Sequence, residues 1–195
     1  MRWVLASSGM LRRRALGWLL VLCVVVPQWA NGSPLGIIAS QVQGITDSAR
    51  AQVLAHLARG EVATAVHAYE VATGLKAPLW LTGFKAAFDA SKQVPGACQD
   101  VARTIHAVFT RLGGKPEYVR LATVADETGK RAGYMVFKMA DGRDLRVTEQ
   151  GFHVVVRMKD RIYDAFTGAG GLSWQEYMGR LGAMTPIMDE VVSAP

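Results

Sequence analysis

The chain has 195 residues, of which half are hydrophobic and 19% are charged, a balance typical of one globular domain with a sizeable core. Its formal net charge is +6, but four of the 22 basic residues lie within the first 32 residues, which contain no acid, leaving 18 basic against 16 acidic residues. No stripe of Lys and Arg with interleaved aromatic residues follows, so the pattern excludes a nucleic-acid surface.

Residues 1–32 predict a signal peptide or membrane anchor. The basic triplet Arg12–Arg14 precedes an unbroken apolar run from Ala15 to Val26, and the small residues Ala30–Gly32 suit cleavage. A spanning helix needs about 20 apolar residues, so the 12-residue run favours a signal peptide, with an anchor over residues 15–30 as the alternative. We therefore expect an exported protein, periplasmic or secreted, that meets the membrane only through this segment.

Residues 33–92 predict a helical N-terminal region. Apolar residues recur every three to four positions in two segments, and Gly60 and Gly74 are candidate stops. The first stripe comprises Ile38, Val42, Ile45, Ala49, Val53 and Leu57, and its candidate N-caps are Thr46, Asp47 and Ser48. A third segment starts at Pro78 and carries Trp80, Phe84 and Phe88 at helical spacing. These stripes are more often core than binding surface.

Residues 93–195 predict a helix followed by antiparallel strands. The helix starts near Cys98, after Pro95-Gly96, and ends at Gly113-Gly114. Its predicted buried face comprises Val101, Ile105, Val108, Phe109 and Leu112. The predicted strands cover Tyr118–Leu121, Tyr134–Phe137, Phe152–Met158 and Arg161–Phe166. Ser173–Glu176 is a capping box that predicts a short helix, whereas the tail from Thr185 gives no clear signal. Helices followed by a meander indicate an α+β fold.

Cys98, His153 and Asp164 form a candidate catalytic set. A thiol at a helix N-terminus has a lowered pKa, because the helix dipole and unpaired backbone N–H groups stabilise the thiolate. A nearby His deprotonates the thiol and later protonates a leaving group, while a carboxylate holds the imidazole in the required tautomer. The alternative for Cys98 is a small buried core residue.

The register of one hairpin decides whether Asp164 reaches His153. If Lys159-Asp160 form a two-residue loop, His153 faces Phe166 and Asp164 is its diagonal neighbour on the same face. A slip of one residue would turn Asp164 to the opposite face. Glu149 and Asp144 are the alternative third groups.

Gln93 and His106 are the other residues considered for a role beside Cys98. The side-chain amide of Gln93 is a candidate oxyanion donor, with an ordinary loop glutamine as the equal alternative. His106 lies eight residues beyond Cys98, about 12 Å along a helix axis, too far to act as the base. Cys98 is the only thiol after the N-terminal segment, and no C-x-x-C or His/Cys zinc spacing occurs. We therefore predict no metal and no cofactor.

The order of these motifs resembles the papain-like and transglutaminase-like superfamily, and in particular the papain-fold toxin 2 domain of bacterial polymorphic toxins. The likeness covers about residues 94–182. The matching motifs are Gly96–Ala102 at the Cys helix, Val119–Leu121 in the next strand, Gly151-Phe152-His153, Ile162-Tyr163-Asp164 and the ending Gly171–Tyr177. In papain relatives the oxyanion glutamine lies six residues before the Cys, whereas Gln93 lies five before Cys98.

This resemblance implies a papain-like catalytic region at 93–195 with Cys98, His153 and Asp164 as the triad. The implied activity is that of a thiol hydrolase or amide-group transferase, of protease, deamidase or transglutaminase type, used as a toxin effector. Its implied partners are a protein or peptide substrate and a cognate immunity protein.

Two other functions remain open from sequence alone. One is a non-enzymatic, envelope-anchored binding module on a papain-like scaffold, in which Cys98 is unreactive. The other is a cell-wall amidase of related fold, which digestion of purified peptidoglycan would distinguish.

Overall fold

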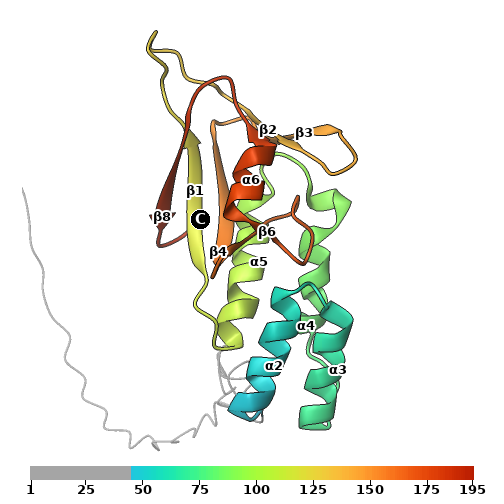
Figure 1. The fold of residues 1–195 in the computed structure, drawn as a ribbon. Helices are drawn as coiled ribbons and strands as arrows, with labels where there is room; N and C mark the ends of the chain where they lie inside the picture. The colour runs from blue at the N-terminus through green and yellow to red at the C-terminus, as the bar shows by residue number, and fades with distance from the viewer. Residues whose placement is uncertain (1–44) are drawn as a thin grey trace, which may run out of the picture.

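The computed structural model describes residues 45–195, and the predicted signal or anchor at 1–32 lies outside these residues. The helical elements are α2 (Asp47–Ala58), α3 (Val62–Thr73), α4 (Leu79–Thr82), η1 (Gly83–Phe88), η2 (Ala90–Lys92), α5 (Cys98–Arg111) and α6 (Trp174–Arg180). The strands are β1 (Glu117–Thr123), β2 (Met135–Lys138), β3 (Asp144–Thr148), β4 (Phe152–Met158), β5 (Arg161–Tyr163), β6 (Leu172–Ser173), β7 (Leu181–Gly182) and β8 (Ile187–Val192). The fold is α+β, as the sequence predicts (Figure 1).

The strands form two antiparallel sheets instead of the predicted meander. The larger sheet has the order β6-β5-β4-β1-β8, and the smaller has the order β3-β2-β7. The β2–β3 hairpin therefore leaves the main sheet, and β1 pairs with β4 and with the C-terminal strand β8. Figure 1 shows β2 and β3 at one end of the molecule, with helices α2, α3 and α4 grouped toward the other.

The helices begin and end largely where local chemistry predicts. Thr46 caps α2, since its side-chain oxygen accepts a hydrogen bond from the Ala49 N–H at 3.3 Å. Gly74 ends α3 in the left-handed conformation, with φ of 67°. The segment after Pro78 differs from the predicted single helix, because one α-turn passes into the 3-10 helix η1.

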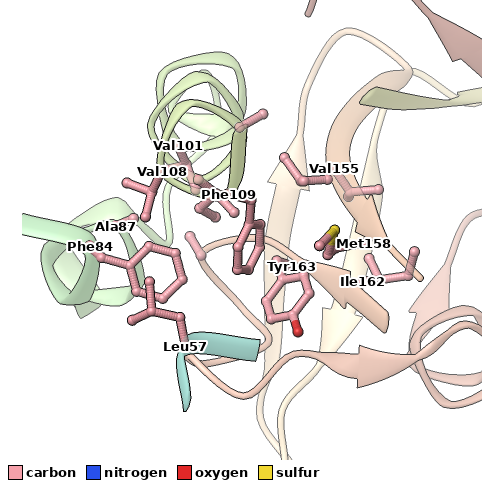
Figure 2. Close-up of a cluster of buried hydrophobic side chains, with 14 of the residues drawn as sticks. Leu57, Phe84, Ala87, Val101, Val108, Phe109, Val155, Met158, Ile162 and Tyr163 are labelled. Atoms are coloured by element: carbon pink, nitrogen blue, oxygen red, sulfur yellow. The ribbon is translucent and has the colours of Figure 1, made fainter. Parts of the chain in front are cut away.

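One hydrophobic core joins the N-terminal helices to the region around Cys98. Phe109 on α5 lies between Phe84 on η1 and Tyr163 on β5, with ring centroids 5.5 and 5.0 Å apart (Figure 2). Leu57 of α2 belongs to the same cluster. A hydrogen bond of 2.8 Å from the Tyr163 hydroxyl to the Ala58 carbonyl adds a polar link. Residues 45–92 and 93–195 therefore share one core.

Within residues 45–195, no helix is long and apolar enough to cross a membrane.

The loops of this part of the chain close tightly at a few glycines. Gly171 has φ of 63°, and a Cβ there would lie 2.7 Å from the Tyr163 ring and 2.8 Å from the Ile162 carbonyl. Glycine at this position therefore permits β6 to pair with β5 and α6 to start directly afterwards.

Ser173→Ala should lower the free energy of unfolding by about 1 kcal/mol, because Ser173 caps α6. Its hydroxyl accepts a hydrogen bond from the Glu176 N–H at 3.2 Å, as the capping box predicts. Urea unfolding followed by fluorescence measures the change. Ser91→Ala, at an exposed serine of η2, is the control and should leave the midpoint unchanged. Equal midpoints for the two variants would contradict the role of the cap.

Candidate active site

Cys98 is the first residue of α5 and lies at the edge of a cavity. The N-cap residue Ala97 makes no side-chain cap, so the first N–H groups of the helix remain available. Cys98 is 9% exposed and borders a cavity of about 300 Å³. The cavity is lined by Pro95, Gly96, Cys98, Gln99, Thr148, Glu149, Gln150 and Phe152. A small amide-bearing group entering this cavity would meet the thiol at the helix N-terminus.

His153 and Asp164 meet through the predicted hairpin register. Met158 pairs with Arg161 and Val156 with Tyr163, which leaves Lys159 and Asp160 as the loop. The strand β5 ends at Tyr163, earlier than predicted, and Asp164 follows it directly. His153 Nε2 lies 2.9 Å from Asp164 Oδ2, and both side chains are almost completely buried. The carboxylate therefore fixes the imidazole by one of its two nitrogens.

The Asp164 carboxylate interacts with four hydrogen-bonding groups. Oδ1 accepts hydrogen bonds from the backbone N–H groups of Phe166 at 2.8 Å and Thr167 at 3.0 Å. Oδ2 accepts a hydrogen bond from the Tyr177 hydroxyl at 2.6 Å and also lies on His153 Nε2. A carboxylate oxygen only accepts hydrogen bonds, so the ring nitrogen that faces Oδ2 is the donor. His153 Nε2 consequently carries a proton, and Nδ1 is the nitrogen that can act as a base.

The second ring nitrogen of His153, Nδ1, is buried and has no hydrogen-bond partner of regular geometry among the described residues. Cys98 lies close enough to His153 to affect the pKa of the imidazole. Burial lowers the pKa of His153, but hydrogen bonds with Asp164 and Cys98 and the charges of both outweigh burial and raise the pKa to about 9. These neighbours therefore favour the protonated imidazole.

The pKa of the Cys98 thiol changes in the opposite direction to that of His153. Burial on its own raises the pKa of Cys98, but the hydrogen bond and charge of His153, with the backbone groups of Val154 and Gln99, outweigh burial. The pKa of the Cys98 thiol is lowered as a result. The imidazole gains proton affinity and the thiol loses it, and both directions favour a thiolate–imidazolium pair.

The structure brings Gln93 to the same region in another role. Its side-chain amide donates a hydrogen bond to the Ala165 carbonyl at 3.0 Å and so braces the loop that follows Asp164. Its action as an oxyanion donor stays a prediction. The alternative third groups do not contact His153: Glu149 pairs with Arg146 at 3.0 Å, and Asp144 is exposed on β3.

Tyr177 is the site residue that sequence reasoning missed. The capping box at Ser173 predicted the helix that carries this tyrosine. The contact with Asp164 was not predictable from local pattern, because it depends on how α6 packs against the end of β5.

His106, excluded as the base by its spacing, stacks on Tyr118 with ring centroids 4.1 Å apart. Among residues 45–195, no group of three or more His, Cys, Asp or Glu side chains is placed to hold a metal ion.

Comparison with protein-family models, with curated proteins and with solved structures finds no match to this chain.

Proposed function

We propose that the protein is an exported cysteine-dependent hydrolase or amide-group transferase with a papain-like arrangement of Cys98, His153 and Asp164. The observation that carries this proposal is the buried Asp164–His153 pair beside a thiol of lowered pKa at a helix N-terminus. A structural core cysteine needs neither a protonated imidazole nor a buried carboxylate behind it. Both are costly to bury and are typical of functional sites.

The first half-reaction forms a thioester. The Cys98 thiolate attacks the carbonyl carbon of an amide, and the carbonyl oxygen becomes an oxyanion facing the free N–H groups at the start of α5. The carbon–nitrogen bond then breaks, and the proton on His153 Nδ1 passes to the departing nitrogen as ammonia or an amine. The acyl group remains on the Cys98 sulfur, and His153 is neutral.

The second half-reaction removes the acyl group. Water, or an acceptor amine, gives a proton to His153 Nδ1 as it attacks the thioester carbonyl. The carbon–sulfur bond breaks, releasing the acid or the new amide and restoring the thiolate–imidazolium pair. Throughout both steps, Asp164 keeps the Nε2 proton in place and stabilises the imidazolium.

The export and effector parts of the proposal come from sequence. The basic triplet before Ala15–Val26 supports export, and the motifs from Gly96 to Tyr177 support a toxin-type domain with an immunity partner. A protein or peptide substrate would reach the thiol through the cavity that Cys98 borders.

Cys98→Ala should abolish product formation on whichever amide substrate the protein uses. The assay offers a protein, glutamine-containing peptides and purified peptidoglycan, and measures new amino termini, released ammonia and soluble muropeptides in separate channels. Thr104→Ala, an exposed change on the same helix, is the control and should keep full activity. Product that persists in Cys98→Ala would overturn the thiol mechanism, and muropeptide release alone would favour the cell-wall amidase.

A further inference from the structure

Tyr177 is the buried group closest to the catalytic carboxylate that the proposed mechanism does not use. Its side chain is completely buried, and its hydroxyl lies 2.6 Å from Asp164 Oδ2, the same oxygen that holds His153. The contact joins α6 to the end of β5. A buried hydroxyl needs a hydrogen-bond partner, but that need does not by itself select the carboxylate oxygen that also holds His153.

We propose that Tyr177 is a positioning residue that acts through Asp164, sharing the negative charge of Oδ2 and thereby limiting how strongly the carboxylate holds the imidazolium proton of His153. This inference rests on the proposed function for its catalytic meaning. Its physical content, a link between the Tyr177 hydroxyl and the proton affinity of His153, stands on geometry alone.

The position of Tyr177 is held from both ends of its helix. Before α6, β6 pairs with β5 through Ile162 and Leu172, and after it β7 pairs with β2. The ring packs against Phe137 with centroids 5.1 Å apart. The hydroxyl therefore cannot move far from Oδ2 without disturbing both sheets, which makes it a fixed donor.

The hydroxyl also keeps its proton over the working pH range. Burial, the charge and hydrogen bond of Asp164 and the charge of Cys98 together raise the pKa of Tyr177 well above its ordinary value. Tyr177 is consequently a permanent donor to the carboxylate. It differs in this respect from His153, whose proton must leave during each catalytic cycle.

The charge balance gives the direction of the effect. The titratable groups facing His153 are Cys98 from α5 and Asp164 after β5, and Tyr177 from α6 reaches it through Asp164. The Phe166 ring, whose centroid lies 6.1 Å from that of His153, is apolar. A hydrogen bond to Oδ2 lowers the negative charge that this oxygen presents to Nε2. Removing the hydroxyl therefore strengthens the hold on the imidazolium proton and makes His153 a weaker acid.

The chain offers a matched control at a second buried tyrosine. The Tyr163 hydroxyl donates a hydrogen bond to the Ala58 carbonyl at 2.8 Å, on the side of the core where α2 packs. Tyr177→Phe and Tyr163→Phe each remove one buried hydroxyl and keep the ring. Each variant removes one hydrogen-bond donor from its acceptor, but only Tyr177→Phe alters the acceptor that holds His153.

The test is an NMR titration of the four histidines in the full chain and in both variants, with thermal unfolding measured alongside. Tyr177→Phe should raise the pKa of His153, so that its proton dissociation constant falls about fivefold to tenfold. Tyr163→Phe should leave the His153 titration unchanged while lowering the melting temperature to a similar degree. A His153 titration that is unmoved or shifted downward in Tyr177→Phe would overturn the inference.

The same samples separate this inference from the proposed function. The alkylation rate of Cys98 in the unchanged protein tests the thiolate–imidazolium pair, whereas the difference between the two tyrosine variants tests Tyr177. An unreactive thiol with a shifted His153 titration would remove the enzyme and keep the Tyr177–Asp164–His153 link. A reactive thiol with an unshifted His153 titration in Tyr177→Phe would keep the enzyme and remove the Tyr177–Asp164–His153 link.

Discussion

The rate at which iodoacetamide alkylates Cys98 at pH 6, divided by the rate at pH 10, should be about 10 to 100 times larger than the same ratio for an ordinary cysteine. An ordinary thiol has a pKa near 8.5, so well under about 1% is thiolate at pH 6. The lowered pKa of Cys98 leaves more thiolate at this pH, although a weaker base is also a somewhat weaker nucleophile. The ratio of rates at the two pH values cancels the restricted access to a nearly buried sulfur.

His153→Ala should remove most of this advantage. The imidazolium supplies the hydrogen bond and the charge that lower the thiol pKa against the opposing effect of burial. Without His153, burial prevails and thiolate forms only at higher pH. Mass spectrometry of the peptide that contains Cys98 follows the alkylation, so that Cys23 does not contribute.

Two further variants distinguish the loss of the imidazole from a folding defect. His153→Gln keeps a side-chain donor for Asp164 and should still lose the low-pH reactivity, because an amide carries no titratable proton. His106→Ala, at the histidine stacked on Tyr118, should keep the reactivity of the unchanged protein. A pH profile that is the same in all variants would show an ordinary thiol and would leave the binding module as the better account.

The parts of the fold with strong local signals were predictable from sequence. The strand Phe152–Met158 has the predicted bounds, because five β-branched or apolar residues precede a two-residue loop. The helix starts at Cys98 as predicted, since Pro95-Gly96 interrupts the preceding segment. The hairpin register is the one expected for a two-residue loop at Lys159-Asp160, a condition that the sequence left open, and Asp164 contacts His153.

Features that depend on long-range packing were not predictable. The strand β8 was missed because most of its residues are exposed and its centre, Asp189-Glu190, is charged, so no alternation marks it. The two-residue strands β6 and β7 are too short for any periodic signal. The departure of the β2–β3 hairpin into a second sheet depends on its pairing with β7, which is distant in sequence.

Asp164→Asn should reduce kcat/KM by about 10³-fold or more while leaving the fold intact, because the change reverses the tautomer of His153. An asparagine has one acceptor oxygen and one donor NH₂ group. The two backbone N–H groups of Phe166 and Thr167 require the oxygen on their side. The NH₂ group then faces Tyr177 and His153 in place of Oδ2.

Only one arrangement of protons satisfies this geometry. The Tyr177 hydroxyl can turn to accept, but His153 Nε2 can accept only if its proton moves to Nδ1. A neutral imidazole with a proton on Nδ1 has its lone pair on Nε2, where it accepts from the amide and cannot take the proton of Cys98, and the charge that stabilised the imidazolium has gone. The thiol therefore loses its base even though every side chain stays in place.

The nitrogen chemical shifts of His153 and the activity assay together measure this change. We expect protonation at Nδ1 in Asp164→Asn at neutral pH, with the loss of kcat/KM and of the Cys98 alkylation at pH 6. Asp144→Asn, which removes an exposed carboxylate from β3, should alter neither. If Asp164→Asn retained activity with the proton still on Nε2, the carboxylate would be a structural partner, and His153 would act on Cys98 without it.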